Sequence, residues 1–206
     1  MRIHLPLLHT LGVVLLYSLP RRKVGHVLFN PAAESILASS SGDFTVKLWD
    51  ITTGQSSLTL KHPEIVQSMS WSANGAMLVT TSRDKKLRVW DVRTEKPVHE
   101  YAGHEGAKNS RAVWLGEHNR IATTGFSRMS ERQIGLWEPG RKDPIGGFTS
   151  LDSISGVCMP FWGKPAIPLV WETISNRVRG RRWIELPVSG RQGVGRISQS
   201  RGMAGC

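Results

Sequence analysis

The sequence predicts an all-β fold made of repeated four-stranded sheets. Two segments end almost alike, GDFTVKLWD at residues 42–50 and RDKKLRVWD at residues 83–91, and their tryptophans, Trp49 and Trp90, are 41 positions apart. A repeat of this length with a Trp-Asp ending is typical of a propeller blade, which buries its core only by stacking on neighbouring blades. We therefore expect a partial β-propeller that serves as a binding platform.

The first two copies of the repeat match position for position without gaps. In each copy, 37–50 and 78–91, an apolar strand with small residues leads into a turn with an aspartate and then a second strand. The second strand alternates between two kinds of side chain, which is the period-two pattern of a strand with two different faces. The turn aspartates, Asp43 and Asp84, are expected to accept hydrogen bonds from nearby backbone N–H groups.

A looser third copy spans residues 121–138, and its turn is longer by four residues, with Glu131 in place of the aspartate. A fourth copy begins at residues 154–162 and is not completed. Further strands are expected upstream of the first three copies, at residues 24–31, 66–75 and 111–120. The sequence thus predicts about three blades and the start of a fourth, in a domain at residues 23–162.

These copies resemble WD repeats, in which a His, a Ser or Thr, the turn Asp and the Trp form a buried hydrogen-bonded tetrad. The resemblance implies structural roles for Asp43, Trp49, His62, Asp84, Trp90, His104 and Trp137. Either Thr80 or Ser82 would complete the second copy. Ser39 or Ser41 would serve in the first, which has no histidine at the matching position. Both histidines are therefore interpreted as structural rather than catalytic or metal-binding.

The amino-acid sequence of the copies resembles that of the first blades of coronins over about residues 21–162. The similarity is carried by RRKVGHVLFNPAAESILASSSGDFTVKLWDI, SMSWSANGAMLVTTSRDKKLRVWDVR and LDSISGVCMPFW, and above all by the long turn in TTGFSRMSERQIGLWE. It implies a cytoplasmic protein of the actin cytoskeleton that binds actin filaments, with the complex that nucleates branched actin as a further partner. It implies neither catalysis nor a cofactor.

The chain also departs from the coronin pattern, which has seven blades, a C-terminal extension and a short coiled coil. The usual basic N-terminal segment and the later blades are missing, and residues 163–206 resemble nothing in the family. An open ring leaves sheet faces and strand edges uncovered, which predicts marginal stability and self-association. The alternatives are a generic WD-repeat scaffold or a truncated fragment that has lost actin binding.

Four basic residues near the turns are the candidates for contact with actin: Lys85, Lys86, Arg128 and Arg132. All four are expected to be exposed, because they lie in or beside turns. The alternative is that they are ordinary solvated loop charges.

The formal net charge of +11 is concentrated at the two ends of the chain. Residues 23–162 hold 16 basic and 14 acidic residues, whereas residues 163–206 hold eight basic and two acidic ones. The basic residues of this tail are interleaved with Gly and Ser and form no recognised nucleic-acid module. We therefore expect a disordered, solvated tail and no specific binding of nucleic acid.

Residues 1–22 form an apolar leader that does not belong to the repeats. Its apolar stretch, residues 5–19, resembles a secretory signal, but the leader contains His4, Pro6 and His9 and has no small-x-small cleavage site. It is short for a membrane span, so none is expected. The alternative is a segment that covers the first blade. The two cysteines, Cys158 and Cys206, form no disulfide framework, which fits a reducing compartment.

Overall fold

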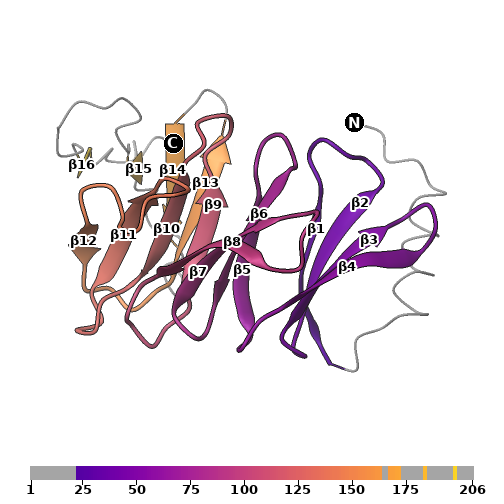
Figure 1. Cartoon of the computed structure of the whole chain (residues 1–206). Helices are drawn as coiled ribbons and strands as arrows, with labels where there is room; N and C mark the ends of the chain where they lie inside the picture. The colour runs from indigo at the N-terminus through magenta and orange to yellow at the C-terminus, as the bar shows by residue number, and fades with distance from the viewer. Residues whose placement is uncertain (1–21, 164–166, 173–182, 185–196, 199–206) are drawn as a thin grey trace, which may run out of the picture. The chain divides into compact units, whose positions relative to one another are not determined.

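The computed structural model describes residues 22–163, 167–172, 183–184 and 197–198 (Figure 1). All secondary structure in these residues is β, which confirms the predicted all-β fold class. The chain divides into two compact units, Met1–Gly103 and His104–Cys206. Within the described ranges, no helix is long and apolar enough to span a membrane.

The first unit contains two four-stranded antiparallel sheets in chain order. The first sheet comprises β1 (Val24–Phe29), β2 (Ile36–Ser41), β3 (Thr45–Asp50) and β4 (Gln55–Lys61). The second comprises β5 (Val66–Trp71), β6 (Met77–Ser82), β7 (Lys86–Asp91) and β8 (Pro97–Ala102). The two sequence copies are thus the hairpins β2–β3 and β6–β7. Their registers agree, because Leu37 lies opposite Trp49 and Leu78 lies opposite Trp90.

The turns of these two hairpins are built alike. Asp43 accepts a hydrogen bond from the backbone N–H of Thr45 at 3.1 Å, and Asp84 accepts one from that of Lys86 at 3.3 Å. The residue after each aspartate has a left-handed backbone conformation, with φ values of 70° and 65°. Both aspartates therefore stabilise the turns that set the register of the strands.

One hydrophobic core holds the two sheets of the first unit together. Its buried members come from both sheets: Ala38, Val46, Leu48, Leu60, Val66, Met69, Trp71, Leu78 and Trp90. Because side chains alternate between the two faces of a strand, each sheet contributes one face to this core. The period-two pattern of the sequence therefore decides which residues meet.

A buried asparagine adds polar contacts between the same two sheets. Asn30 donates a hydrogen bond from Nδ2 to the carbonyl oxygen of Gly75 at 2.8 Å, and its Oδ1 accepts bonds from the N–H groups of Ala32 and Ala33. The indole N–H of Trp71 also donates to the carbonyl oxygen of Leu28, at 3.4 Å. The β1–β2 turn and the β5–β6 turn are thereby fixed to each other.

We expect Gly75→Ala to destabilise the protein by about 2 kcal/mol. Gly75 has a φ of +68°, and a Cβ atom there would lie 2.0 Å from Oδ1 of Asn30. The substitution therefore adds backbone strain and also displaces the side chain that joins the two turns. Chemical denaturation of the purified chain measures the effect. Gly146→Ala is the matched control, because Gly146 has a φ of +73° but no atom within 4 Å. Equal losses for both variants would contradict the proposed clash.

The second unit contains a third four-stranded antiparallel sheet, again with its strands in chain order. It comprises β9 (Arg111–Trp114), β10 (Ile121–Phe126), β11 (Arg132–Trp137) and β12 (Phe148–Asp152). A two-stranded sheet follows, formed by β13 (Cys158–Gly163) and β14 (Ile167–Glu172). Thr124 donates a hydrogen bond to the carbonyl oxygen of Cys158 at 2.7 Å, so β13 lies against the third sheet. The predicted three sheets and the start of a fourth are confirmed.

The segment 163–206, expected to be disordered, differs from that expectation where the structure describes it. It contains β14 and the paired short strands β15 (Trp183–Ile184) and β16 (Ile197–Ser198). The sequence of β14, IPLVWE, is rich in strand-forming residues, and its pairing with β13 explains the difference. The predicted leader lies outside the described residues except for Arg22. The domain boundaries at residues 22 and 162 stay predictions.

Candidate binding surface

A buried chain of polar side chains holds the second sheet together. The indole N–H of Trp90 donates to the hydroxyl oxygen of Thr80 at 2.9 Å, and Nε2 of His62 lies 3.0 Å from the same oxygen. Nδ1 of His62 lies 3.3 Å from the carbonyl oxygen of Leu60, which can only accept, so Nδ1 carries the proton. Nε2 therefore accepts a hydrogen bond from Thr80. Of the two hydroxyl residues considered, Thr80 occupies this place.

Burial, together with the positive charge of the neighbouring Arg88, lowers the pKa of His62 from 6.5 to about 4. The ring is therefore neutral at physiological pH, and both its nitrogens are engaged in hydrogen bonds. A neutral, buried ring in this position has no free nitrogen to offer a substrate or a metal ion.

The third sheet contains the same arrangement. Trp137 donates from its indole N–H to the hydroxyl oxygen of Thr123 at 2.8 Å, and Nε2 of His104 lies 3.0 Å from that oxygen. The ring packs directly on Gly125, where a Cβ atom would lie 2.3 Å from Cγ of His104. Burial lowers the pKa of His104 to about 4. Thr123 was not singled out from the sequence, although it follows Ile121 as Thr80 follows Leu78.

The first sheet has a shorter version of this chain. Trp49 donates from its indole N–H to the hydroxyl oxygen of Ser39 at 2.8 Å. Ser41 instead accepts a weak bond from the N–H of Asp43 at the turn. Ser39 therefore takes the place that Thr80 and Thr123 take in the other sheets.

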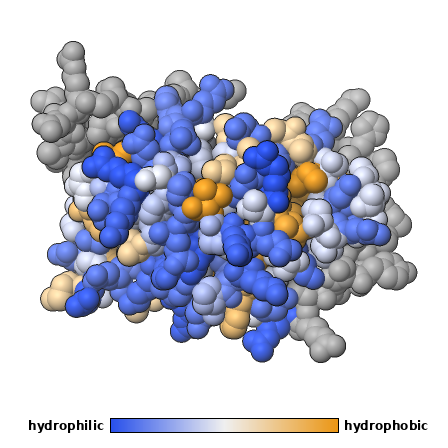
Figure 2. All heavy atoms as spheres, in the orientation of Figure 1, coloured by the Kyte–Doolittle hydropathy of each residue, from blue (hydrophilic) through white to orange (hydrophobic). Residues whose placement is uncertain are grey.

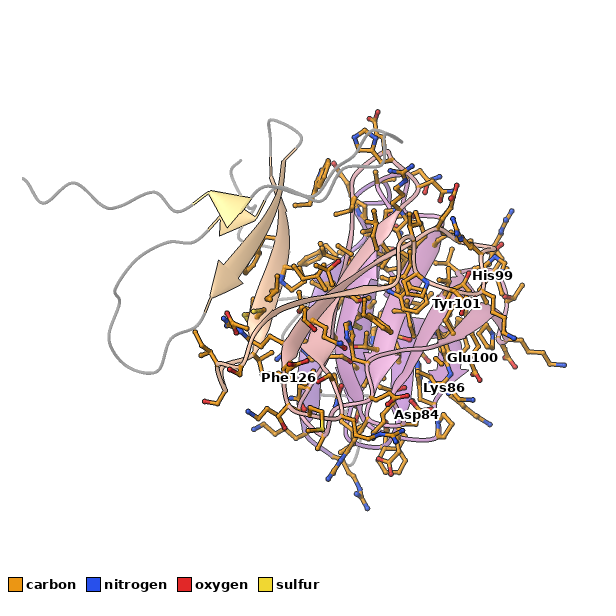
Figure 3. All side chains as sticks on the ribbon, turned by 90° about the vertical axis from the view of Figure 1, so that its left-hand side faces the viewer. Asp84, Lys86, His99, Glu100, Tyr101 and Phe126 are labelled. Carbon is orange, nitrogen blue, oxygen red and sulfur yellow. The ribbon has the colours of Figure 1, made fainter. Side chains whose placement is uncertain are left out.

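Asp84 belongs to a second network, which the sequence did not reveal. Arg88 is only 3 % exposed, and its guanidinium group bonds to the carboxylate of Asp84 and, at 2.8 Å, to that of Glu100. Lys86 also pairs with Glu100, and Ser82 bonds to Asp84. Arg88 lies opposite Glu100 in the register of β7 and β8, and Asp84, Lys86 and Glu100 are labelled near one another in Figure 3.

The pKa values of both carboxyl groups follow from this network. Burial alone would raise the pKa of Asp84, but hydrogen bonds from Arg88 and Ser82 outweigh it and lower the pKa below its ordinary value. The hydrogen bond from Lys86 and the charge of Arg88 lower the pKa of Glu100. Both groups therefore stay ionised at neutral pH and hold Arg88 in place.

Three of the four candidate partner-binding residues are exposed. Lys85 follows the turn aspartate in the left-handed conformation, and the side chain of Lys86 is 47 % exposed. The side chain of Arg128 is 82 % exposed and pairs with Glu105 at 3.1 Å. The first two belong to the first unit and Arg128 to the second.

The expected exposure of Arg132 is wrong. Arg132 begins β11 and is 2 % exposed, and its Nε donates to a carboxylate oxygen of Asp152 at 2.5 Å. Asp152 lies opposite Arg132 in the register of β11 and β12, which brings the two charges together. Arg132 is therefore a buried structural charge within the sheet rather than a surface contact.

The first unit has a strongly basic end. The turns of β2–β3 and β6–β7 lie there beside the starts of β1 and β5, because the N–H of Gly42 donates to Lys23 O at 2.9 Å and that of Arg83 donates to Ile65 O at 2.9 Å. Six exposed basic residues lie at this basic end: Arg22, Lys23, Lys61, Arg83, Lys85 and Lys86. The acidic residues there are Asp43, Glu64, Asp84 and Glu100, and Glu100 pairs with Lys86.

The other end of the first unit has the opposite balance. Its acidic residues are Glu34, Asp50, Asp91 and Glu95, and its basic residues are Arg93 and Lys96. The unit is thus electrostatically polarised, with its positive charge gathered where β1, β3, β5 and β7 begin. On the face drawn in Figure 2, hydrophobic residues form small separate groups among hydrophilic ones.

The chemistry of this surface is suited to binding by charge. Among the described residues, no group of three or more His, Cys, Asp or Glu side chains is placed to hold a metal ion. The sequence reasoning named Lys85 and Lys86 but missed the rest of the basic end. Arg22, Lys23 and Arg83 flank a predicted strand or its turn, which was the available signal, whereas Lys61 ends β4, a strand that was not predicted.

The chain matches the family described as WD domain, G-beta repeat, at residues 15–50 and 54–91. It is 58 % identical to the coronin-like protein of Saccharomyces cerevisiae, over 69 % of this chain and 22 % of the relative. It is 60 % identical to the coronin-like protein crn1 of Schizosaccharomyces pombe, over 68 % of this chain and 24 % of the relative. The chain thus spans about a quarter of the length of these relatives.

A solved structure agrees with the sequence relatives. The crystal structure of the WD40 domain from Toxoplasma gondii coronin superposes with a TM-score of 0.73 and 27 % identity, covering 86 % of this chain and 45 % of that one. The three four-stranded sheets of this chain agree with this fold. The chain therefore belongs to the coronin family, to whose members it is similar over about two thirds of its length, and it carries WD40 repeats at residues 15–50 and 54–91.

Proposed function

We propose that this chain is a non-catalytic binding module that attaches to actin filaments and takes part in organising the actin cytoskeleton in the cytoplasm. Its membership of the coronin family and its WD40 repeats support this function. The same relationship makes the complex that nucleates branched actin a second candidate partner. Because the chain spans about a quarter of its relatives' length, these activities are proposed for the part that it contains.

The observation that carries the proposal is the basic end of the first unit. Actin filaments are acidic, so a surface with six exposed basic side chains attracts them. The β6–β7 turn, which presents Lys85 and Lys86, is held by Asp84, and the β2–β3 turn at the same end is held by Asp43. Because these turns are already ordered, binding costs little conformational entropy there. Exposed charges of this kind govern the association rate and make binding sensitive to salt.

Co-sedimentation of the full chain with actin filaments at low and physiological salt tests the proposal. We expect binding at both concentrations, weaker at the higher one. The double substitution Lys85→Ala with Lys86→Ala should weaken binding by about fivefold at low salt and reduce the salt dependence. Lys96→Ala is the matched control, because Lys96 is also exposed but lies at the acidic end.

One outcome would count against actin binding, and two would count against the basic end as its site. If the wild-type chain stays in the supernatant at low salt, actin binding is wrong for this chain. If the double variant and Lys96→Ala bind equally well, the basic end does not carry the contact. Pelleting that disappears with modest salt and survives the double substitution would assign the attraction to basic residues elsewhere in the chain.

A further inference from the structure

The turn between β10 and β11 is longer than its counterparts, yet it has a defined structure. The N–H of Ser127 donates to the carbonyl oxygen of Glu131 at 2.8 Å, and that of Ser130 donates to the carbonyl oxygen of Ser127 at 3.0 Å. The hydroxyl oxygen of Ser127 also accepts a bond from the N–H of Glu131 at 3.1 Å. Ser130 takes the left-handed conformation, with a φ of 64°. Residues 127–131 therefore form a projection beyond the strands that is held by its own hydrogen bonds.

The tip of this projection is apolar. Met129 is 82 % exposed, which is the largest value among the exposed large hydrophobic residues of the described ranges, ahead of Phe29 at 51 %. A single exposed apolar residue is common on protein surfaces. Met129 differs because the hydrogen-bonded turn holds it outward, and the shorter turns of the β2–β3 and β6–β7 hairpins have no equivalent of this segment. An unbranched thioether side chain also adapts well to an irregular pocket.

Arg128 lies beside Met129 and is equally exposed. Its guanidinium group pairs with Glu105 at 3.1 Å, and the two side chains are 82 % and 62 % exposed. An ion pair with both partners this exposed contributes little stability. Arg128 can therefore exchange Glu105 for a carboxylate on another protein at small cost. The turn thus combines an apolar tip with a guanidinium group that is available for a new partner.

We propose that Met129 is an apolar anchor that inserts into a pocket on the actin filament, with Arg128 paired to a carboxylate at the rim of that pocket. This inference rests on the proposed function and adds a contact that charge alone does not supply. Anchors of this kind, an apolar side chain in a pocket next to an arginine, carry much of the energy of protein interfaces. The contribution of Met129 comes from removing apolar surface from water, so salt does not screen it.

The test compares filament co-sedimentation of Met129→Ala and wild type at two salt concentrations. Burial of this side chain predicts affinity about tenfold weaker for Met129→Ala, by the same factor at both concentrations. Met129→Leu should keep most of the affinity, because leucine offers a similar apolar volume. Val98→Ala is the matched control, since Val98 is also exposed, at 47 %, but lies on β8. Thermal melting should be unchanged for all three variants, because neither side chain is buried in the fold.

The outcomes separate the anchor from the proposed function. If wild type pellets with filaments and Met129→Ala pellets equally well, the anchor is wrong while filament binding stands. If Met129→Ala weakens binding only at low salt, the effect is electrostatic and the apolar anchor is also wrong. If wild type does not bind filaments at all, the proposed function and the anchor are both overturned.

Discussion

Lowering the pH from 7 to 5 should destabilise the folded protein by about 4 kcal/mol through its two buried histidines alone. His62 and His104 have pKa values of about 4 in the folded chain, because burial disfavours the charged ring. The same rings have a pKa near 6.5 when the chain is unfolded. Below pH 6.5 the unfolded chain therefore binds protons that the folded chain does not, and each ring accounts for about 2 kcal/mol at pH 5.

The sign of this effect sets the pH window. Well above pH 6.5 both rings are neutral in both states, so they contribute no pH dependence there. Between pH 6.5 and about 4 the stability falls as the pH falls, and below pH 4 the contribution of the rings is constant. Carboxyl groups with lowered pKa values, such as Asp84, also stabilise the folded protein, and that stabilisation is lost only at lower pH, where they become protonated. The range from pH 7 to 5 therefore isolates the histidines best.

Urea unfolding at pH 7 and pH 5 measures the effect. His62→Gln should be less stable than wild type at pH 7, because the hydrogen bonds of the ring are lost, but its stability should fall less between pH 7 and 5. His118→Gln is the control, since His118 is exposed at the β9–β10 turn. A wild-type chain equally stable at both pH values would show that the rings are not buried as neutral groups.

Thr80→Val should destabilise the protein by about 4 kcal/mol. The two side chains have nearly the same shape, so the packing of the core is preserved. The hydroxyl group, however, accepts from Trp90 and donates to His62, and Thr80 is fully buried. The substitution leaves a buried indole N–H and a buried ring nitrogen without their partner, and each such group costs about 1–3 kcal/mol.

Chemical denaturation at neutral pH checks this expectation. Thr149→Val is the matched control, because Thr149 lies on β12 with its side chain exposed, and it should change the stability little. A loss of stability of less than 1 kcal/mol for Thr80→Val would contradict the conclusion that both hydrogen bonds of Thr80 stabilise the fold. Even one buried polar group left without a partner costs about that much. The fluorescence of Trp90 should also report a changed environment in the folded variant.

The strands and hairpins could be predicted because their causes are local. Val46 and Leu48 alternate with Lys47 and Trp49, and alternation by two residues is a property of any strand. The turn aspartates bond to the backbone two residues away, so short segments of sequence contain the whole turn. The same local causes fixed the register that brings Leu78 opposite Trp90.

The candidate surface was only partly predictable, because exposure depends on distant residues. Arg132 looked like a turn residue, yet Asp152, twenty residues later, buries and neutralises it. Arg88 lies on an alternating strand, but the alternation does not show that Glu100 on β8 and Asp84 at the turn enclose its guanidinium group. Lys85 and Arg128 remained exposed, because each extends from a turn.

The sequence by itself determined the all-β class, the repeated hairpins and the family, because strand periodicity, turn chemistry and repeat spacing are written along the chain. Only the tertiary structure decided which hydroxyl serves each tryptophan, which arginines are buried, and where the positive charge of the first unit gathers. These properties depend on which strands become neighbours and which faces are covered, and that is set by pairing between residues far apart in the sequence.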